Sequence, residues 1–219
     1  MRRSSLLSAH RKLEKLYAPV GFEPGGNPLN QLIATILSQN TTDKNSERAY
    51  ASLRKRFPKW EQVADASLPS ISASIRQGGL ANSKSRSIRN ALRTIREREG
   101  RISLARLEKM SDDEVMEYLT SMPGVGVKTA ACVLLFSMGR PVMPVDTHVF
   151  RVTSRLGWLP KGTKPEEAGA ILKRNLPDEM VLSMHIYLVR HGRALCKAQR
   201  PRCDQCPLAG QCRYAHQAG

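Results

Sequence analysis

Residues 122–130 read Met-Pro-Gly-Val-Gly-Val-Lys-Thr-Ala, and residues 145–148, a short way further on, read Val-Asp-Thr-His. In the first of these stretches Pro123 cannot continue a preceding helix, because its nitrogen has no hydrogen to donate. Gly124 and Gly126 carry no side chain and can adopt the positive φ angles that tight turns need. The pattern predicts a Gly-x-Gly turn that joins two helices.

Capping residues and apolar spacing indicate a helix on each side of this turn. Before the turn, residues 111–114 read Ser-Asp-Asp-Glu, a capping box that opens a short helix. After it, an apolar run begins at Val127 or Lys128 and reaches Phe136. Gly139 is expected to end that second helix. Such a pair is either an ordinary helix–helix corner or a phosphate site, since free backbone amides at a helix start attract anions.

Lys128 lies in the first turn of the second expected helix, at the positive end of the helix dipole. That position, together with partial burial, disfavours the charged ammonium form. The neutral amine is a nucleophile, whereas the ammonium is not. Lys128 is therefore a candidate nucleophile, and the alternative is that it only binds a phosphate.

Asp146 precedes an apolar stretch and is expected to be the N-cap of a helix that runs to Gly157. Capping alone explains an aspartate at this position. A capping carboxylate is also held rigidly, which suits an acid–base or electrostatic role, so the two interpretations are compatible. Asp43 and the box formed by residues 163–166 are expected to cap other helices.

The chain has five cysteines, and four of them lie close together in the sequence. Cys132 falls in the apolar helix and is expected to be an ordinary buried side chain. Disulfides are not expected between the others, because nothing marks the chain as secreted. A zinc site commonly uses two close pairs of ligands, whereas four thiolates can also hold a [4Fe–4S] cluster. The residues alone predict a metal or cluster site at Cys196, Cys203, Cys206 and Cys212.

The charge of the chain favours a polyanionic partner. The sequence has 35 Lys and Arg residues against 19 Asp and Glu, which gives a formal net charge of +16. A membrane surface is the other polyanion to weigh, but the longest apolar run, residues 130–136, is too short to span a bilayer. The Leu6-Leu7 pair is likewise too short for a signal peptide. We expect no membrane association and a cytoplasmic protein.

The stretches around Lys128 and Asp146 resemble the endonuclease III branch of the helix-hairpin-helix, Gly-Pro-Asp superfamily of DNA glycosylases. In that family the lysine after the hairpin attacks the sugar C1′ of a flipped, damaged nucleotide, and the aspartate assists the attack and stabilises charge on the sugar. The resemblance implies these roles for Lys128 and Asp146. The four clustered cysteines have the family's spacing, which implies one [4Fe–4S] cluster. A departure is Val127, where the family often has a basic residue.

The fold class expected from the sequence is all-α, because no stretch alternates as a strand. The resemblance implies two helical domains that flank a DNA-binding cleft. Residues 28–140 would form a six-helix domain with the hairpin, and residues 1–27 and 141–219 would form the cluster domain. Lys128 and Asp146 would then face each other across the cleft. Apolar residues at helical spacing predict helices over residues 6–16, 29–37, 50–57 and 88–95.

The resemblance also implies residues that enter the duplex when a base flips out. Gln39 and Asn40 are both candidates for filling the gap beside the orphaned base, and Asn40 corresponds to the family's usual amide. Leu80 matches a wedge residue of the family. A basic loop that the cluster would hold is expected to contact phosphates. The expected DNA contacts are Gln39, Asn40, Thr41, Leu80, Ser83, Lys84, Gly124, Val125, Gly126, Val127, His148, Lys197, Arg200 and Arg202.

We therefore expect a base-excision-repair DNA glycosylase with AP-lyase activity. It would act as a monomer on duplex DNA that contains oxidised pyrimidines or abasic sites. An adenine-specific relative is disfavoured, because it would have a catalytic Glu near Ala34 and would lack the lysine at position 128. The alternatives that stay open are a mismatch-specific glycosylase of the same superfamily and a non-catalytic iron–sulfur DNA-binding protein.

Overall fold

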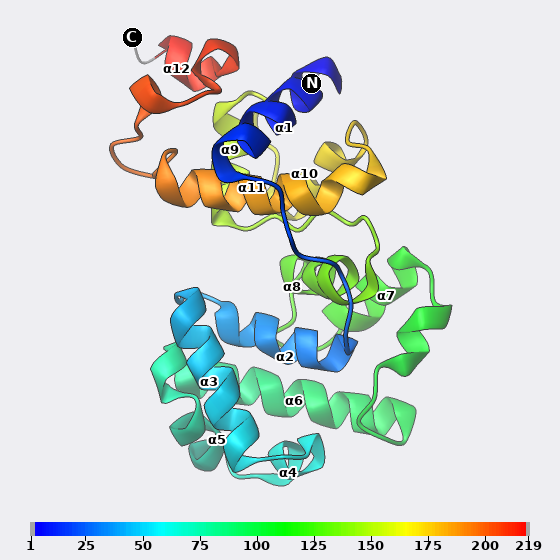
Figure 1. Ribbon diagram of the computed structural model, residues 1–219. Coiled ribbons are helices and arrows are strands. Elements are labelled where there is room, and N and C mark those ends of the chain that lie inside the picture. Colours follow the sequence, from blue (N-terminus) through cyan, green and yellow to red (C-terminus); the bar gives the residue numbers. More distant parts are fainter. Residues whose placement is uncertain (1–2, 218–219) are drawn as a thin grey trace. The chain divides into compact units, whose positions relative to one another are not determined.

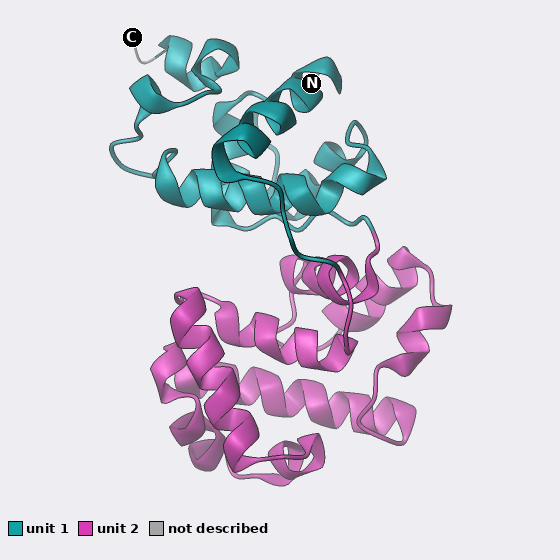
Figure 2. Cartoon of the chain, in the orientation of Figure 1, with its two compact units in different colours: residues 1–23, 141–219 teal, residues 24–140 magenta. Residues whose placement is uncertain are grey.

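The computed structural model describes residues 3–217, and in that range every regular element is a helix (Figure 1). The all-α prediction is confirmed. The chain divides into two compact units (Figure 2). The central unit is continuous from Pro24 to Arg140. The terminal unit combines residues 1–23 with residues 141–219.

The central unit is built around α6, the long amphipathic helix Ala81–Glu99, which packs against α2, α4 and α5. Ile88, Leu92 and Ile95 recur at helical spacing on the buried face of α6. The helix α2 packs in turn against α3 and α8. The elements of this unit are α2 (Pro28–Ser38), α3 (Asp43–Arg56), α4 (Trp60–Asp65), α5 (Leu68–Ser74), η1 (Arg76–Gly78), α6, η2 (Ala105–Lys109), α7 (Asp112–Thr120), α8 (Val127–Cys132) and η3 (Val133–Ser137).

The terminal unit is built around α11, which packs against α9 and α1. Gly192 lets α11 and α9 approach closely, since a Cβ atom there would lie 2.7 Å from the Cβ of His148. The elements of this unit are α1 (Arg3–Tyr17), α9 (Thr147–Arg155), α10 (Pro165–Lys173), η4 (Asp178–Met180), α11 (Val181–Ala194), η5 (Cys203–Gln205), η6 (Ala209–Gln211) and α12 (Arg213–Gln217).

The four helices expected from apolar spacing correspond to α1, α2, α3 and α6, but two expected caps are wrong. The N-cap of α3 is Thr42, whose hydroxyl accepts from the Asn45 N–H at 3.3 Å, and Asp43 is the first helical residue. The helix α10 begins at Pro165 rather than one residue earlier. Its N-cap is therefore Lys164, whose N–H donates to the Glu167 carboxylate at 3.4 Å.

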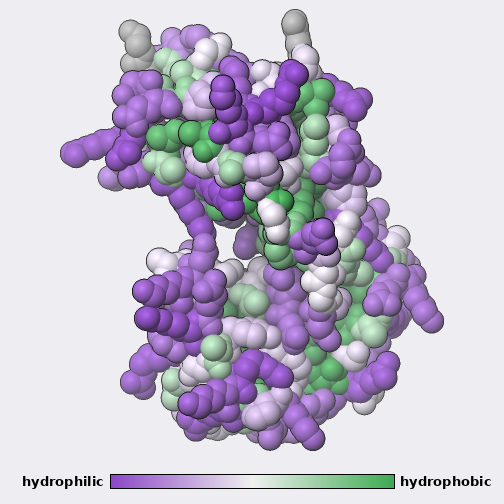
Figure 3. All heavy atoms as spheres, in the orientation of Figure 1, coloured by the Kyte–Doolittle hydropathy of each residue, from purple (hydrophilic) through white to green (hydrophobic). Residues whose placement is uncertain are grey.

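The exposed surface is mainly hydrophilic on the face of each unit that Figure 3 shows. Among the described helices, none combines the length and the apolar composition needed to cross a bilayer. Few large apolar side chains of residues 3–217 face solvent, and the most exposed of these is Leu80, at 57%. An isolated exposed leucine is common, but the backbone of Leu80 is also in the left-handed region, with φ +50°. That combination makes it a candidate for contact with a partner.

Candidate functional site

The Gly-x-Gly turn joins α7 to α8, as the sequence predicts. The capping box at the start of α7 is present, because the Ser111 N–H donates to the Glu114 carboxylate at 2.7 Å and the Ser111 hydroxyl accepts from the Glu114 N–H. These hydrogen bonds hold the pKa of Glu114 below its usual value. The Val125 N–H closes the turn by donating to the Met122 carbonyl at 3.0 Å.

Only glycine fits at position 124 of the turn, whereas glycine at position 126 leaves the backbone uncovered. Gly124 has φ +88°, and a Cβ atom there would lie 2.7 Å from the Cβ of Ser87 and would also clash with its hydroxyl. Gly126 is the N-cap of α8 with φ −96°, and a Cβ atom there would meet nothing within 4 Å. Both glycines are exposed. The turn therefore presents bare backbone at the start of α8, as an anion site needs.

Lys128 is the second residue of α8 and is half-buried. Among the described residues its ammonium has no hydrogen-bond or ion-pair partner. The predicted start of this helix is confirmed, but its end differs, since α8 passes at Cys132 into the π-helical turn η3. Such π turns are frequent at functional sites. Gly139, with φ +66°, follows the end of η3.

Asp146 caps α9, as the sequence predicts. Its Oδ1 accepts the Val149 N–H at 2.7 Å, which fixes the orientation of a half-buried carboxylate. One oxygen is thus held by the helix, and the second stays available. A carboxylate oriented in this way suits proton transfer or charge stabilisation without rearrangement.

The next turns of α9 carry two arginines that connect this helix to the cysteine segment. Arg151 donates from Nε to the Cys196 carbonyl at 2.9 Å and from Nη2 to the Gly192 carbonyl at 2.8 Å. Its Nη2 also lies 3.1 Å from Nδ1 of His148. Arg155 donates to the Lys197 and Ala198 carbonyls at 2.7 and 3.0 Å. The sequence reasoning missed both, although they lie four residues apart on the helix that Asp146 caps.

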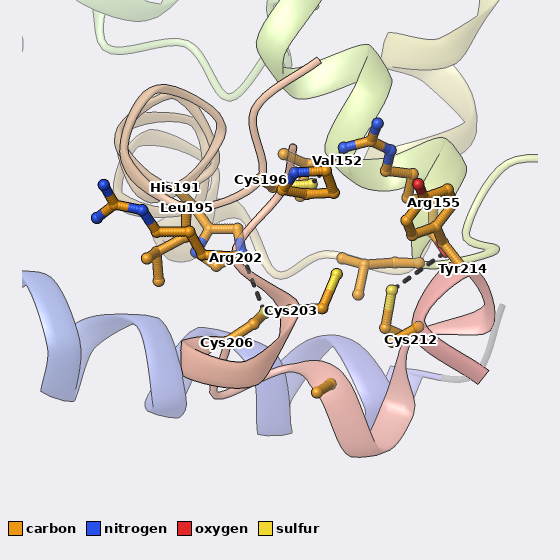
Figure 4. Close-up of a pocket in the computed structure, with 14 residues that line it drawn as sticks. Val152, Arg155, His191, Leu195, Cys196, Arg202, Cys203, Cys206, Cys212 and Tyr214 are labelled. Atoms are coloured by element: carbon orange, nitrogen blue, oxygen red, sulfur yellow. Dashed lines mark hydrogen bonds between the residues drawn. The ribbon is translucent and has the colours of Figure 1, made fainter. Parts of the chain in front are cut away.

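The four clustered cysteines line a single pocket in the terminal unit (Figure 4). Two N–H donors face their sulfurs. Arg155 Nη1 lies 3.4 Å from Cys196 Sγ, and Nε2 of His191 lies 3.4 Å from Cys206 Sγ. No three His, Cys, Asp or Glu side chains in the described part of the chain are spaced to hold one metal ion. The cysteines instead surround a shared space.

The protonation of His191 follows from its surroundings. Burial lowers its pKa to about 4, so the ring is neutral near pH 7. Burial raises the pKa of Tyr17 to about 12, and the neighbouring thiols of Cys206 and Cys196 add to this shift, so Tyr17 keeps its proton. The Tyr17 hydroxyl lies 3.1 Å from Nδ1 of His191, and a hydrogen carried on Nε2 would point towards Cys206.

This donor set fits an iron–sulfur cluster. Burial raises the pKa of Cys206, and burial together with the nearby Cys212 and Cys196 raises the pKa of Cys203. Four crowded thiolates repel one another unless cations lie between them, which iron would supply. N–H groups directed at the sulfurs stabilise thiolate charge further.

The basic loop between Cys196 and Cys203 is exposed at Lys197, Arg200 and Arg202. Arg155 holds its first residues through the two carbonyl contacts described above. The guanidinium of Arg155 also lies 4.5 Å from the ring centre of Tyr214. The loop is therefore anchored at its base while its cationic side chains face solvent.

Five expected DNA contacts lie in two short segments of the central unit. Asn40 and Leu80 are exposed, and both have φ +50°. Ser83 is exposed in the first turn of α6, and Thr41 is half-buried. Gln39 is half-buried, and its side chain donates to the Thr129 hydroxyl at 3.4 Å. Of the two amides, Asn40 is the more accessible.

Two expected DNA contacts need correction. Lys84 is only 2% exposed, and its ammonium donates to the carbonyls of Leu37 and Gly78, so it does not reach a phosphate. Burial lowers its pKa. Val125 is 4% exposed, and its N–H is used inside the hairpin turn, so it supports the turn from within. Sequence alone does not distinguish a lysine that points inward from one that points outward.

Family comparisons match both the region with the hairpin and the segment with the four cysteines. Residues 33–178 match the family described as HhH-GPD superfamily base excision DNA repair protein. This range contains the hairpin, Lys128 and Asp146. Residues 196–212 match the iron–sulfur binding domain of endonuclease III and contain all four clustered cysteines.

Curated relatives support the same family. Endonuclease III of Sulfolobus acidocaldarius is 35% identical over 190 residues, which cover 86% of this chain and 82% of the relative. Endonuclease III of Thermotoga maritima is 34% identical over 193 residues, which cover 88% of this chain and 86% of the relative. A candidate DNA glycosylase of Arabidopsis thaliana is 41% identical over 191 residues, and the chain spans 65% of that protein's length.

Solved structures match the whole chain. Endonuclease III trapped as a covalent intermediate with DNA superposes with a TM-score of 0.83 and 29% identity, covering 100% of this chain and 99% of that one. A non-covalent endonuclease III–DNA complex gives a TM-score of 0.84 at 29% identity, with coverage of 100% and 98%. The chain belongs to the endonuclease III family of the HhH-GPD superfamily of base-excision-repair DNA glycosylases, and it carries that family's iron–sulfur binding domain.

Proposed function

We propose that this protein is a bifunctional DNA glycosylase and AP lyase that removes oxidised pyrimidines from duplex DNA. The observation that carries the proposal is the position of Lys128 at the second residue of the helix that follows a bare Gly-x-Gly turn, with no partner for its amine among residues 3–217. An amine at this position can act as a nucleophile when it is neutral. A related endonuclease III has been solved as a covalent intermediate with DNA, which supports the same chemistry here.

The reaction that we propose begins when the neutral Lys128 amine attacks C1′ of the flipped nucleotide. A C–N bond forms, the glycosidic bond breaks, and the damaged base leaves with the bonding electrons and takes up a proton. Loss of a proton from the lysine nitrogen and opening of the sugar ring give a Schiff base between Nζ and C1′. Removal of a proton from C2′ then expels the 3′ phosphate by β-elimination, and hydrolysis of the imine frees the enzyme.

Asp146 is proposed to assist these proton transfers and to stabilise positive charge on the sugar. Its capping hydrogen bond to Val149 holds the carboxylate in one orientation, so little reorganisation is needed when charge develops. The same carboxylate close to phosphates opposes DNA binding. Asp146 should therefore increase turnover while slightly reducing affinity.

Binding is proposed to combine three elements. The amides of the hairpin contact phosphates at Gly124, Gly126 and Val127. The basic loop contributes Lys197, Arg200 and Arg202, and a [4Fe–4S] cluster on the four cysteines would fix that loop. Asn40 and Leu80 enter the duplex at the flipped site. Gln39, Thr41, Ser83 and His148 are proposed as further DNA contacts.

A panel of duplexes with single defined lesions tests this function against its alternatives. Oxidised pyrimidines should be released with strand cleavage, and mismatched thymine should not. Release of mismatched thymine without cleavage would instead identify a mismatch-specific enzyme. Binding without release of any base would identify a non-catalytic DNA-binding protein. Base release and strand cleavage are read from one denaturing gel, with and without alkaline treatment of the product, and binding is read from a native gel.

The cluster assignment predicts different results for the four clustered cysteines and for Cys132. The purified protein should contain four irons per chain and show broad visible absorption, as four thiolates on a [4Fe–4S] cluster imply. Cys203→Ser should lose iron and lower the melting temperature, because the segment from Cys196 to Cys212 has little regular structure to hold it. Cys132→Ser is the matched control, since it changes a thiol buried in α8 and should leave iron content unchanged. Stoichiometric zinc in anaerobically prepared protein would contradict this assignment.

The basic loop can be tested through salt dependence. Arg200→Ala should weaken binding to damaged and undamaged duplexes alike and flatten the slope of log K against log salt by about one unit, as loss of one phosphate contact predicts. Arg101→Ala is the control, because it removes the same charge from an exposed position in the central unit. An Arg200 variant with an unchanged slope would place that side chain away from DNA.

A further inference from the structure

Two short segments of the central unit rest on the same buried side chain. The amide loop (residues 39–42) connects α2 to α3, and the wedge turn (residues 79–80) connects η1 to α6. Lys84 Nζ donates to the Leu37 carbonyl at 2.7 Å and to the Gly78 carbonyl at 2.9 Å. Each carbonyl lies just before one of the two segments. One ammonium therefore ties the starts of both segments together.

The charge of Lys84 suits this place. Leu37 is in the last turn of α2, and Gly78 is the last residue of η1, so both carbonyls belong to helix C-termini that lack helical partners. A positive charge is favoured at the C-terminal end of a helix dipole. Lys84 itself lies in the first turn of α6 and is only 2% exposed, so water does not compete for these contacts. The two hydrogen bonds from Lys84 are therefore shielded from solvent.

The two segments also share a strained backbone. Asn40 and Leu80 have φ +50°, as do few other non-glycine residues of the described chain, namely Ala18 and Arg200 at similar angles. A leucine in the left-handed region is a genuine outlier, and such a conformation persists only where the surroundings impose it. The side chains of both positive-φ residues, Asn40 and Leu80, are exposed.

A second set of contacts fixes η1 to the helix that follows the amide loop. The Gln77 side chain donates to the Arg48 carbonyl of α3 at 3.0 Å. Gly78 is buried so closely on α3 that an added Cβ atom would lie 3.0 Å from the Cβ of Ala49. The wedge turn and the amide loop are therefore parts of one rigid assembly, with Lys84 at its centre.

We propose that Lys84 is a positioning residue that holds Asn40 and Leu80 at a fixed spacing, so that both enter the duplex together. The inference rests on the proposed function, since it concerns how that function reaches a paired lesion. An apolar side chain separates stacked bases, and an amide pairs with an orphaned base. If both side chains enter at once, the apolar side chain and the amide replace the stacking and the pairing of the flipped base in a single step.

The test compares Lys84→Met with wild type on two substrates under single-turnover conditions. One is a lesion in a fully paired duplex, and the other is the same lesion in a short mismatched bubble, where bases are already unstacked. Lys84→Met should lower base release from the paired duplex by roughly 10–100-fold and change release from the bubble by less than about threefold. Lys84→Arg, which keeps donors at this place, should recover part of the loss.

Arg93→Met is the matched control. Arg93 lies on the same helix and donates to the Ala64 carbonyl near the end of α4 at 2.8 Å, away from both segments. It should reduce stability without distinguishing the two substrates. Equal losses on both substrates for Lys84→Met would overturn the inference, and so would a salt slope reduced by about one, which indicates a direct phosphate contact.

A double-mutant cycle keeps the inference testable even if Lys84→Met does not fold. Asn40→Gly retains the positive φ and removes the amide, and Leu80→Ala removes the wedge. On the paired duplex, the double variant should lose little more activity than the worse single variant, because linked groups act as a unit. If the losses of the two single variants add up in the double variant, Asn40 and Leu80 act independently, which would refute the inference while leaving the proposed function intact. A wild-type protein inactive on both substrates would refute the proposed function itself.

Discussion

Lys128→Gln is expected to abolish the covalent adduct with DNA and to slow base release by more than about 10⁴-fold, since removal of a nucleophile eliminates the covalent route. Folding should be retained, because the lysine side chain has no partner among the described residues and glutamine is an equally good helix former. Removing a positive charge from the start of α8 should even stabilise the helix by about 0.3–1 kcal/mol. The measurements are single-turnover base release and thermal unfolding.

The control for this variant is DNA affinity. The hairpin glycines and the basic loop are unchanged in Lys128→Gln. Its affinity for a duplex with an uncleavable lesion analogue should therefore stay within about threefold of wild type, the effect of losing one unpaired charge. A variant that binds normally and still releases base at the wild-type rate would show that another group is the nucleophile.

Asp146→Asn is expected to bind DNA as well as wild type or better, while turnover falls by roughly 10²–10⁴-fold, the range for loss of acid–base assistance. The substitution is unusually clean, because an asparagine oxygen can accept the Val149 N–H as the aspartate does. Asparagine and aspartate are equally good N-caps. The fold of α9 should therefore survive, and the loss should be in turnover.

Asp146→Ala separates capping from chemistry. It removes the cap as well and should cost about 1 kcal/mol of stability in addition to the lost activity. If Asp146→Asn turns over normally and only Asp146→Ala is impaired, the carboxylate is a cap and has no role in the reaction. Chemical denaturation and single-turnover kinetics on the same preparations distinguish these results.

Local patterns predicted much of the fold. The capping box at Ser111, the Gly-x-Gly turn and the capping by Asp146 all follow from short-range hydrogen bonding, and each occurs as predicted. Short helices were not predicted from these patterns, because the six residues of α4 are too few to establish a helical period. The π turn η3 depends on packing around an almost wholly apolar segment, which leaves no sequence pattern.

The candidate site could likewise be predicted only in part from the sequence. Cysteine spacing identified the cluster ligands, but the residues that support them come from distant parts of the sequence. Tyr17 and His191 meet beside Cys206, and Arg155 reaches the loop after Cys196, through long-range packing of α1, α9 and α11. The inward direction of Lys84 likewise depends on α2 and η1, which its own neighbours in sequence do not specify.

The most direct test of the lysine Schiff base is borohydride reduction during turnover, followed by mapping of the linked peptide. Wild-type protein is mixed with a duplex that carries one oxidised pyrimidine, and borohydride reduces the imine to a stable amine. We predict a single protein–DNA adduct whose digested peptide carries the sugar remnant on Lys128. No adduct with any lesion or abasic duplex, or an adduct mapped to another residue, would contradict the account.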